Sequence, residues 1–137
     1  IYVTHKDPTF GREDQIHITI LYGLHTDTPE PVRNLIEKTG PVKIKLGKTS
    51  IFTDPYKFNV VIIEAFSDEL NELNKQLVTL KHTSKYGNIY RPHVTIAYVK
   101  KGKGWKFQKW NTWEGMEFEC NYAIFSSKNG SKDKILL

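Results

Sequence analysis

The chain has 137 residues, of which 39% are hydrophobic, and its formal net charge is +5. This length suits a single domain over residues 1–137, because domains most often span roughly 100–150 residues, and the apolar content excludes disorder as the default state. The single Cys120 cannot form an internal disulfide, and the apolar runs are far shorter than the roughly 18 residues of a membrane span. We therefore predict a soluble, cytoplasmic protein, whose mild positive charge permits an anionic ligand.

The first predicted elements are a strand and a helix. Residues 16–21 form an apolar, β-branched run that is typical of a strand. The helix is expected to begin with Asp27 or Thr28 as its N-cap, to have Pro29 near its first position and to stop at Gly40. A strand followed by a helix is the first part of a β-α-β-β arrangement.

The middle of the chain predicts two more strands and a second helix. Apolar residues alternate with lysines over residues 42–46, which indicates a half-buried strand. The run from Phe58 to Ile63 is apolar at both alternating positions, which suits a central strand covered on both faces. The second helix begins at Ser67 as N-cap and lines up four leucines on one side. These leucines are Leu70, Leu73, Leu77 and Leu80.

The last third of the chain predicts strands and turns. Alternating apolar residues over 118–124 indicate a strand, and Asn129-Gly130 is typical of the tip of a terminal hairpin. Over residues 100–110, aromatic residues are interleaved with lysines, which predicts either a solvated edge hairpin or a surface for a nucleic-acid backbone. The whole pattern indicates an α+β fold with mostly antiparallel sheets.

One short motif occurs twice. The segment His17-Ile18-Thr19-Ile20-Leu21-Tyr22 is echoed by His93-Val94-Thr95-Ile96-Ala97-Tyr98. Alternate residues of a strand share a face, so each histidine and its threonine point to one side, away from the neighbouring apolar residues and tyrosines. If the two halves pack about a pseudo-twofold axis, four polar side chains meet in one cleft. Two imidazoles supply both an acid and a base at neutral pH, and threonine hydroxyls donate hydrogen bonds to phosphate oxygens.

These paired His-x-Thr segments resemble the two-histidine (2H) phosphoesterase superfamily, which includes LigT-like RNA ligases and cyclic phosphodiesterases. The resemblance implies a bilobed, pseudo-twofold fold of two mainly antiparallel sheets flanked by helices, with one His-x-Thr strand in each lobe. The strings HITILYGLH and HTSKYGNIYRPHVTIAYVK are also similar to phage-encoded members that degrade cyclic oligonucleotide defence signals. For such a member, the location implied is the host cytoplasm.

The resemblance implies metal-independent cleavage of a phosphodiester without a cofactor. The catalytic residues carried over by motif are His17, Thr19, His93 and Thr95. One histidine removes a proton from the attacking water or ribose 2′-hydroxyl, the other protonates the leaving oxygen, and the threonines hold the phosphoryl group. The motifs leave open which histidine has which role.

Further residues are candidates for binding the substrate. Arg91 has the same strand parity as His93, so its guanidinium is a candidate phosphate ligand. Loop aromatics are candidates for stacking on a base. These aromatics are Tyr86, Tyr90, Phe52 and Tyr56. By the same parity, Tyr22 and Tyr98 are expected on the face opposite the histidines, packed into a core.

Three functions fit this pattern. The first is hydrolysis of a small nucleotide with a cyclic or 2′-linked phosphate, such as a cyclic nucleotide or cyclic oligonucleotide. The second is an RNA 2′,3′-cyclic phosphodiesterase or 2′-5′ RNA ligase. The third is a nucleotide- or RNA-binding module that has lost turnover. The modest charge favours a small ligand over extended RNA, and no membrane partner is expected.

Overall fold

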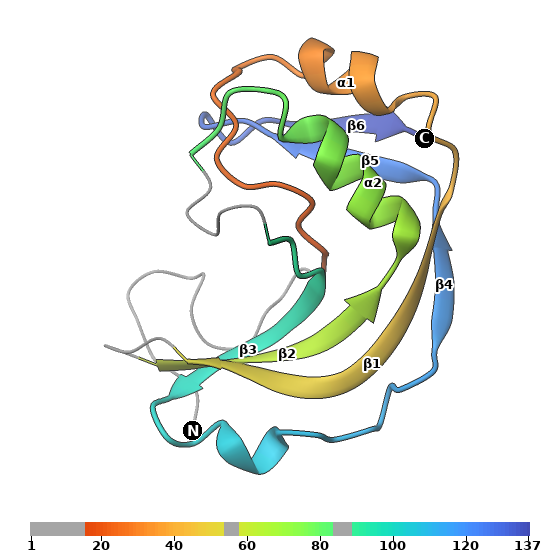
Figure 1. Cartoon of the computed structure of the whole chain (residues 1–137). Coiled ribbons are helices and arrows are strands. Elements are labelled where there is room, and N and C mark those ends of the chain that lie inside the picture. The colour runs from red at the N-terminus through yellow and green to blue at the C-terminus, as the bar shows by residue number, and fades with distance from the viewer. Residues whose placement is uncertain (1–15, 54–57, 84–88) are drawn as a thin grey trace. The chain divides into compact units, whose positions relative to one another are not determined.

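The computed structural model describes residues 16–53, 58–83 and 89–137 (Figure 1). It is an α+β structure in which the strand pairs β1–β2, β2–β3 and β5–β6 are antiparallel. One sheet has the strand order β3-β2-β1-β4, and a second contains β5 and β6. The elements are α1 (Glu30–Ile36), β1 (Val42–Thr53), β2 (Phe58–Phe66), α2 (Asp68–Leu77), β3 (His93–Lys100), the 3₁₀ helix η1 (Trp105–Phe107), β4 (Glu117–Cys120), β5 (Tyr122–Ser126) and β6 (Lys132–Leu136).

The chain divides into two compact units, each assembled from three separate stretches. The first, called the strand unit below, contains the described residues of 1–18, Lys45–Phe66 and Arg91–Met116. The second, called the helical unit, contains the described residues of Thr19–Ile44, Ser67–Tyr90 and Glu117–Leu137. Strands β2 and β3 and most of β1 therefore belong to the strand unit, and both α-helices belong to the helical unit.

A β-bulge in β3 decides which side chains share a face of the strand-unit sheet. Ile62 of β2 lies opposite Thr95, but the preceding Val61 lies opposite Ala97. Ile96 is therefore an extra residue on β3 and shifts the alternation of every side chain that follows it. Beyond the bulge, residues that strict alternation would place on one face lie on the other.

The register defines two faces, because residues directly opposite each other in an antiparallel pair lie on the same side. On the polar face, Glu64, Ile62 and Val60 of β2 lie opposite His93, Thr95 and Tyr98 of β3, respectively. On the apolar face, Val61 and Asn59 lie opposite Ala97 and Val99. A buried cluster of Val61, Ala97 and Val99 forms the core beneath this second face.

The segment after β3 covers the apolar face. The buried side chain of Asn59 fixes its start, because Asn59 Oδ1 accepts hydrogen bonds from the backbone N–H groups of Gly102 (2.9 Å) and Gly104 (3.3 Å). A side chain at Gly104 would clash with Asn59, with its Cβ only 2.9 Å from that of Asn59. The edge hairpin predicted here does not form, since the aromatic residues lie in η1 and the loop after it.

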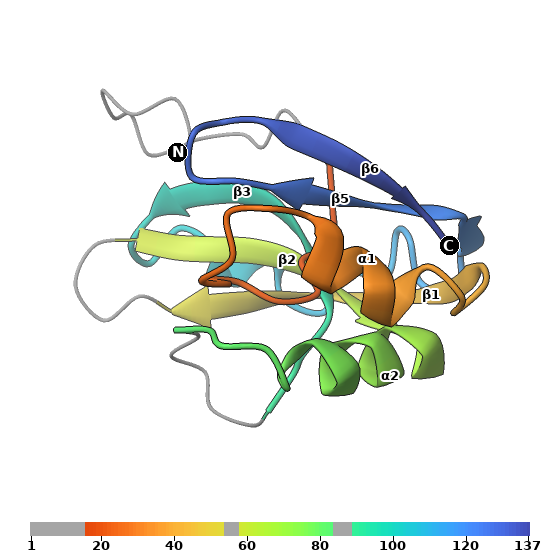
Figure 2. The ribbon, with the colours of Figure 1, turned by 90° about the horizontal axis from the view of Figure 1, so that it is seen from above.

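The helices of the helical unit follow their capping signals. The Oγ of Ser67 accepts a hydrogen bond from the backbone N–H of Leu70 (3.1 Å), which confirms the predicted N-cap of α2. The first helix begins slightly later than predicted, with Pro29 itself as N-cap. Helix α1 packs against α2, and Figure 2 shows the two helices side by side.

The terminal hairpin of the helical unit also forms as predicted. Strands β5 and β6 pair antiparallel on either side of a turn with Gly130 at a φ of 89°, a conformation that favours glycine. Phe125 and Ile135 are buried on one face of the hairpin. The predicted strand over 118–124 is divided at Asn121 into β4 and β5.

The first His-x-Thr segment does not form the strand predicted over residues 16–21. Its extended pairing is limited to one isolated antiparallel bridge between Ile18 and Val94 in the strand unit. In the helical unit, Asn74 Nδ2 donates a hydrogen bond to the carbonyl of Ile20 (2.8 Å) and thereby holds the next part of this segment. Separately, no helix in the described parts of the chain is long and apolar enough to cross a membrane.

Candidate active site

His93 is the first residue of β3 and is half-buried on the polar face. Its Nδ1 lies 2.8 Å from the carbonyl oxygen of Arg91. Because a carbonyl can only accept a hydrogen bond, this contact requires a proton on Nδ1 and leaves Nε2 with its lone pair in the neutral ring. The ring of Phe52 packs edge-on against the imidazole at a centroid distance of 4.8 Å. Both contacts fix the orientation of the imidazole.

The surroundings of His93 lower its pKa below the ordinary value of 6.5. Burial is the main cause, because it disfavours the charged imidazolium. The hydrogen bond to the Arg91 carbonyl raises the pKa, and the positive charges of Arg91 and His17 lower it further. Near pH 7 the ring is therefore neutral and its Nε2 can accept a proton.

His17 belongs to the same unit and is exposed. Its neighbour Ile18 lies opposite Val94 in the bridge, so His17 projects to the other side, as His93 and Thr95 do beside Val94. The charge of His17 is also the smallest of the causes that lower the pKa of His93, as expected for two imidazoles on one face of the unit. Two histidines and one threonine of the motif are thus gathered on the polar face.

Thr19, the threonine of the first motif, belongs to the helical unit. Its carbonyl oxygen accepts a hydrogen bond from the hydroxyl of Tyr90 (2.8 Å), and burial raises the pKa of Tyr90 well above its usual range. Tyr90, predicted to stack on a base, therefore uses its hydroxyl to hold the backbone of the first motif.

Arg91 lies just before β3, and its guanidinium is held over the polar face by three partners. It forms an ion pair with Glu64, lies 3.4 Å from Ser50 Oγ and stacks over the Phe52 ring at 4.9 Å from the centroid. The side chain of Arg91 is still 48% exposed. A guanidinium that is oriented but accessible is well suited to bind a phosphate oxygen.

Tyr98 is on the face opposite to the one predicted. The bulge at Ile96 brings it to the polar face, where its ring packs edge-on against Phe58 with centroids 5.5 Å apart. Tyr22 was also predicted to pack into a core, but it is 74% exposed. The prediction for Tyr98 assumed strict alternation along β3. The extra residue Ile96 breaks that alternation and moves Tyr98 to the other face.

The other predicted binding residues have mixed outcomes. Phe52 lies in β1 rather than in a loop and contacts His93 and Arg91. Tyr56 and Tyr86 fall outside the described residues. Sequence reasoning missed Glu64 and Ser50, because only the strand register shows that they share the face of Arg91. Among the residues that the structure describes, no group of three His, Cys, Asp or Glu side chains is placed to hold a metal ion.

Comparison with known families found one match. Residues 3–121 match the 2′-5′ RNA ligase superfamily. The chain belongs to this superfamily, whose members are phosphoesterases and ligases of the LigT-like 2H class. The searches of curated proteins and of solved structures found no match.

Proposed function

We propose that the chain cleaves a cyclic or 2′-linked phosphodiester of a small nucleotide by two-histidine acid–base catalysis. The observation that carries this proposal is the polar face, where the Arg91 carbonyl fixes the tautomer of His93, burial lowers the pKa of His93, and Arg91 stays accessible. The bridge between Ile18 and Val94 turns His17 to the same face. Membership of a superfamily of phosphoesterases and ligases supports the same chemistry.

The lowered pKa of His93 favours it as the general base. In the proposed reaction, Nε2 of His93 removes a proton from an attacking water while the water oxygen forms a bond to phosphorus. The bond from phosphorus to the leaving oxygen breaks, and that oxygen takes a proton from the imidazolium of His17. The cycle ends with His93 protonated and His17 neutral, and exchange of one proton with solvent restores both.

The phosphoryl group is proposed to be held by hydrogen-bond donors. Arg91 supplies a cation on the polar face, and the hydroxyl of Thr95 projects from the same face of β3 as His93. Thr19 completes the first His-x-Thr motif, and by that motif we propose the same role for its hydroxyl. Donors aimed at a developing negative charge stabilise the transition state.

Substrate choice is the finer part of the proposal. A cyclic nucleotide or cyclic oligonucleotide is favoured by the modest charge of +5, and a phage counter-defence role would follow from the second of these substrates. An RNA 2′,3′-cyclic phosphodiesterase or 2′-5′ ligase uses the same two histidines, and an inactive binding module uses the same face without turnover.

A substrate panel tests these possibilities. The chain is incubated with 2′,3′-cyclic nucleotides, cyclic dinucleotides, cyclic trinucleotides and 2′-5′ oligonucleotides in the presence of a chelator, and products are identified by mass spectrometry. We expect cleavage of a cyclic substrate that is lost in His93→Ala. Binding without turnover of any substrate contradicts the enzyme proposal, and activity that requires an added divalent ion contradicts the mechanism.

A further inference from the structure

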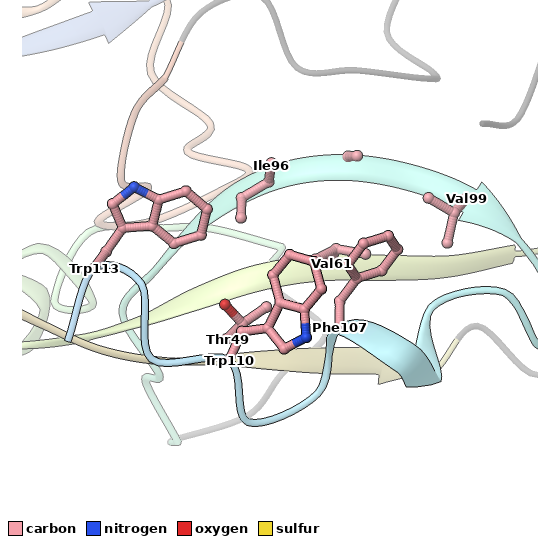
Figure 3. Close-up of a pocket in the computed structure, with 8 residues that line it drawn as sticks. Thr49, Val61, Ile96, Val99, Phe107, Trp110 and Trp113 are labelled. Atoms are coloured by element: carbon pink, nitrogen blue, oxygen red, sulfur yellow. The ribbon is translucent and has the colours of Figure 1, made fainter. Parts of the chain in front are cut away.

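The apolar face of the strand-unit sheet carries a pocket that the proposed reaction does not use. Figure 3 shows it between β3, β2 and β1 and the segment that follows η1. Its volume is about 110 Å³. The lining residues are Thr49, Val61, Ile96, Ala97, Val99, Phe107, Trp110 and Trp113. All of them belong to the strand unit, and seven are apolar or aromatic.

Thr49 is the polar residue of this lining. It is only 2% exposed, and among the described residues its Oγ1 has no hydrogen-bond partner. Its backbone, by contrast, is fully paired, with its N–H donating to Trp110 and its carbonyl accepting from Lys109, both at 2.8 Å. Because buried hydroxyls are normally hydrogen-bonded, this pocket is matched to a ligand that brings a polar atom to Thr49.

The size and the aromatic lining of the pocket limit the ligand to a single ring. An enclosed apolar cavity of roughly 150 Å³ holds a benzene ring. This pocket is smaller, at about 110 Å³, so it has room for one six-membered ring at most, and the rest of a ligand must extend out of it. The open side is bordered by Trp110, which is 46% exposed and packs edge-on against Phe107 at 4.8 Å. An exposed indole beside an apolar slot favours stacking with an aromatic ligand.

The charges nearby favour an anion. Five lysines lie in residues 100–109, a stretch that contains no acidic residue. All five are exposed. They are Lys100, Lys101, Lys103, Lys106 and Lys109. They share a segment of the chain with Phe107, and Lys106 Nζ lies 5.1 Å from the centroid of the Phe107 ring, so this segment attracts phosphate.

We propose that this pocket binds the pyrimidine base of a phosphate-bearing ligand. The base packs on Trp110 and the neighbouring apolar side chains, and one of its polar ring substituents completes the hydrogen bond of Thr49 Oγ1. The lysines lie near its phosphate. A free nucleotide and a base within an RNA strand share this chemistry, and a purine is disfavoured because its second ring exceeds the slot. The binding does not depend on catalysis at the polar face.

Tryptophan fluorescence tests the proposal locally, because all three tryptophans of the chain, Trp105, Trp110 and Trp113, lie in this segment. The full chain is titrated with UMP, AMP and a ten-nucleotide oligouridylate. We expect saturable quenching with UMP binding more tightly than AMP. If the oligouridylate binds more tightly than UMP, and its affinity falls steeply as salt rises, the site is assigned to RNA. If UMP and the oligouridylate bind with equal affinity, it is assigned to the free nucleotide.

Three variants locate the binding. Thr49→Val keeps the shape of the side chain but removes the hydroxyl, and we expect roughly three- to tenfold weaker binding. Ala97→Leu fills the slot and should abolish saturable quenching. Trp110→Ala removes an exposed stacking surface, so it tests the site even where the core variant fails to fold, and we expect about tenfold weaker binding.

His93→Ala is the matched control. His93 lies in β3, as Ala97 does, but on the polar face, so its loss is expected to leave the quenching at the apolar pocket unchanged. Absence of saturable quenching by all three ligands overturns the proposal. So does quenching that Thr49→Val and Trp110→Ala leave intact. Quenching that His93→Ala abolishes would belong to the polar face, and would leave the apolar pocket without a ligand role.

Discussion

The two faces of the strand-unit sheet are built from the same strands but have opposite chemistry. On one face, Glu64, Arg91 and His93 are held by an ion pair, a hydrogen bond and ring contacts while remaining partly accessible. On the other, Val61 and Val99 are buried under an aromatic segment. A strand can therefore serve a reactive site and a packed core together, and substitutions on its two faces should have separable effects.

Loss of the imidazole from either histidine should have the largest effect. We expect His93→Ala and His17→Ala each to lower kcat by roughly 10²- to 10⁴-fold, because each removes one acid or base, while the thermal unfolding curve is retained. His82→Ala is the control, since the Nδ1 of His82 lies 2.8 Å from the carbonyl of Leu80, a local contact like that of His93 but in the helical unit. Full activity in either catalytic variant, with saturating substrate, would end the two-histidine mechanism.

The pH dependence of kcat/KM should sharpen the roles of the two histidines. His93 must be neutral to act as base, so the rate should fall about tenfold per pH unit on the acid side, below the pKa of His93. Because that pKa is lowered, this limb should lie below pH 6.5. An alkaline limb is also expected, because a reaction that needs both an acid and a base has a bell-shaped pH profile. A profile that is flat from acid to alkaline pH, measured where chemistry limits the rate, would mean that the histidines exchange no proton.

Removing the guanidinium of the polar face should act on binding more than on turnover. We expect Arg91→Ala to raise KM roughly tenfold, because a charge-assisted hydrogen bond to phosphate is lost. Glu64→Gln should have a smaller effect, since it releases Arg91 from its ion pair but keeps the cation. Lys48→Ala, which removes an exposed charge from β1, controls for net charge. Equal KM values in all three variants would exclude a phosphate contact by Arg91.

A substitution on the apolar face should change stability alone. Ile63 is buried next to Glu64 in β2 but points to the other side. We expect Ile63→Val to lower the free energy of unfolding by about 0.5–1.5 kcal/mol and to leave kcat and KM of the folded protein unchanged. Denaturant unfolding measures the first and steady-state kinetics the second. A change in kcat comparable to that of His93→Ala would show that the faces are not independent.

Most elements of the fold could be predicted because their signals are local. The hydroxyl of Ser67 begins α2, Asn129-Gly130 lies at the tip of the hairpin, and alternating apolar residues mark the start of β1. The first motif was harder, since its apolar run resembles a strand but pairs only through Ile18. Whether an apolar segment becomes a strand depends on a partner that is distant in sequence.

The site could be predicted as far as the motif reaches. His93 and Thr95 share a face as alternation predicts, but Tyr98 does not, because the extra residue Ile96 is set by pairing with β2 and not by its own identity. Nothing in the sequence around Glu64 marks it as part of the site. The ion pair between Glu64 and Arg91 depends on the register of β2 against β3, which cannot be derived from the sequence alone.

The interleaved assembly of the two units has a consequence for how the protein is made. Each unit combines three stretches of chain, so any single cut between Thr19 and Met116 divides both units. During synthesis, β1 and β2 emerge well before β3, and the edge of β2 that later pairs with β3 stays open for that interval. We therefore expect a nascent chain released before Lys100 to aggregate, and the polar face to form only after most of the protein has left the ribosome.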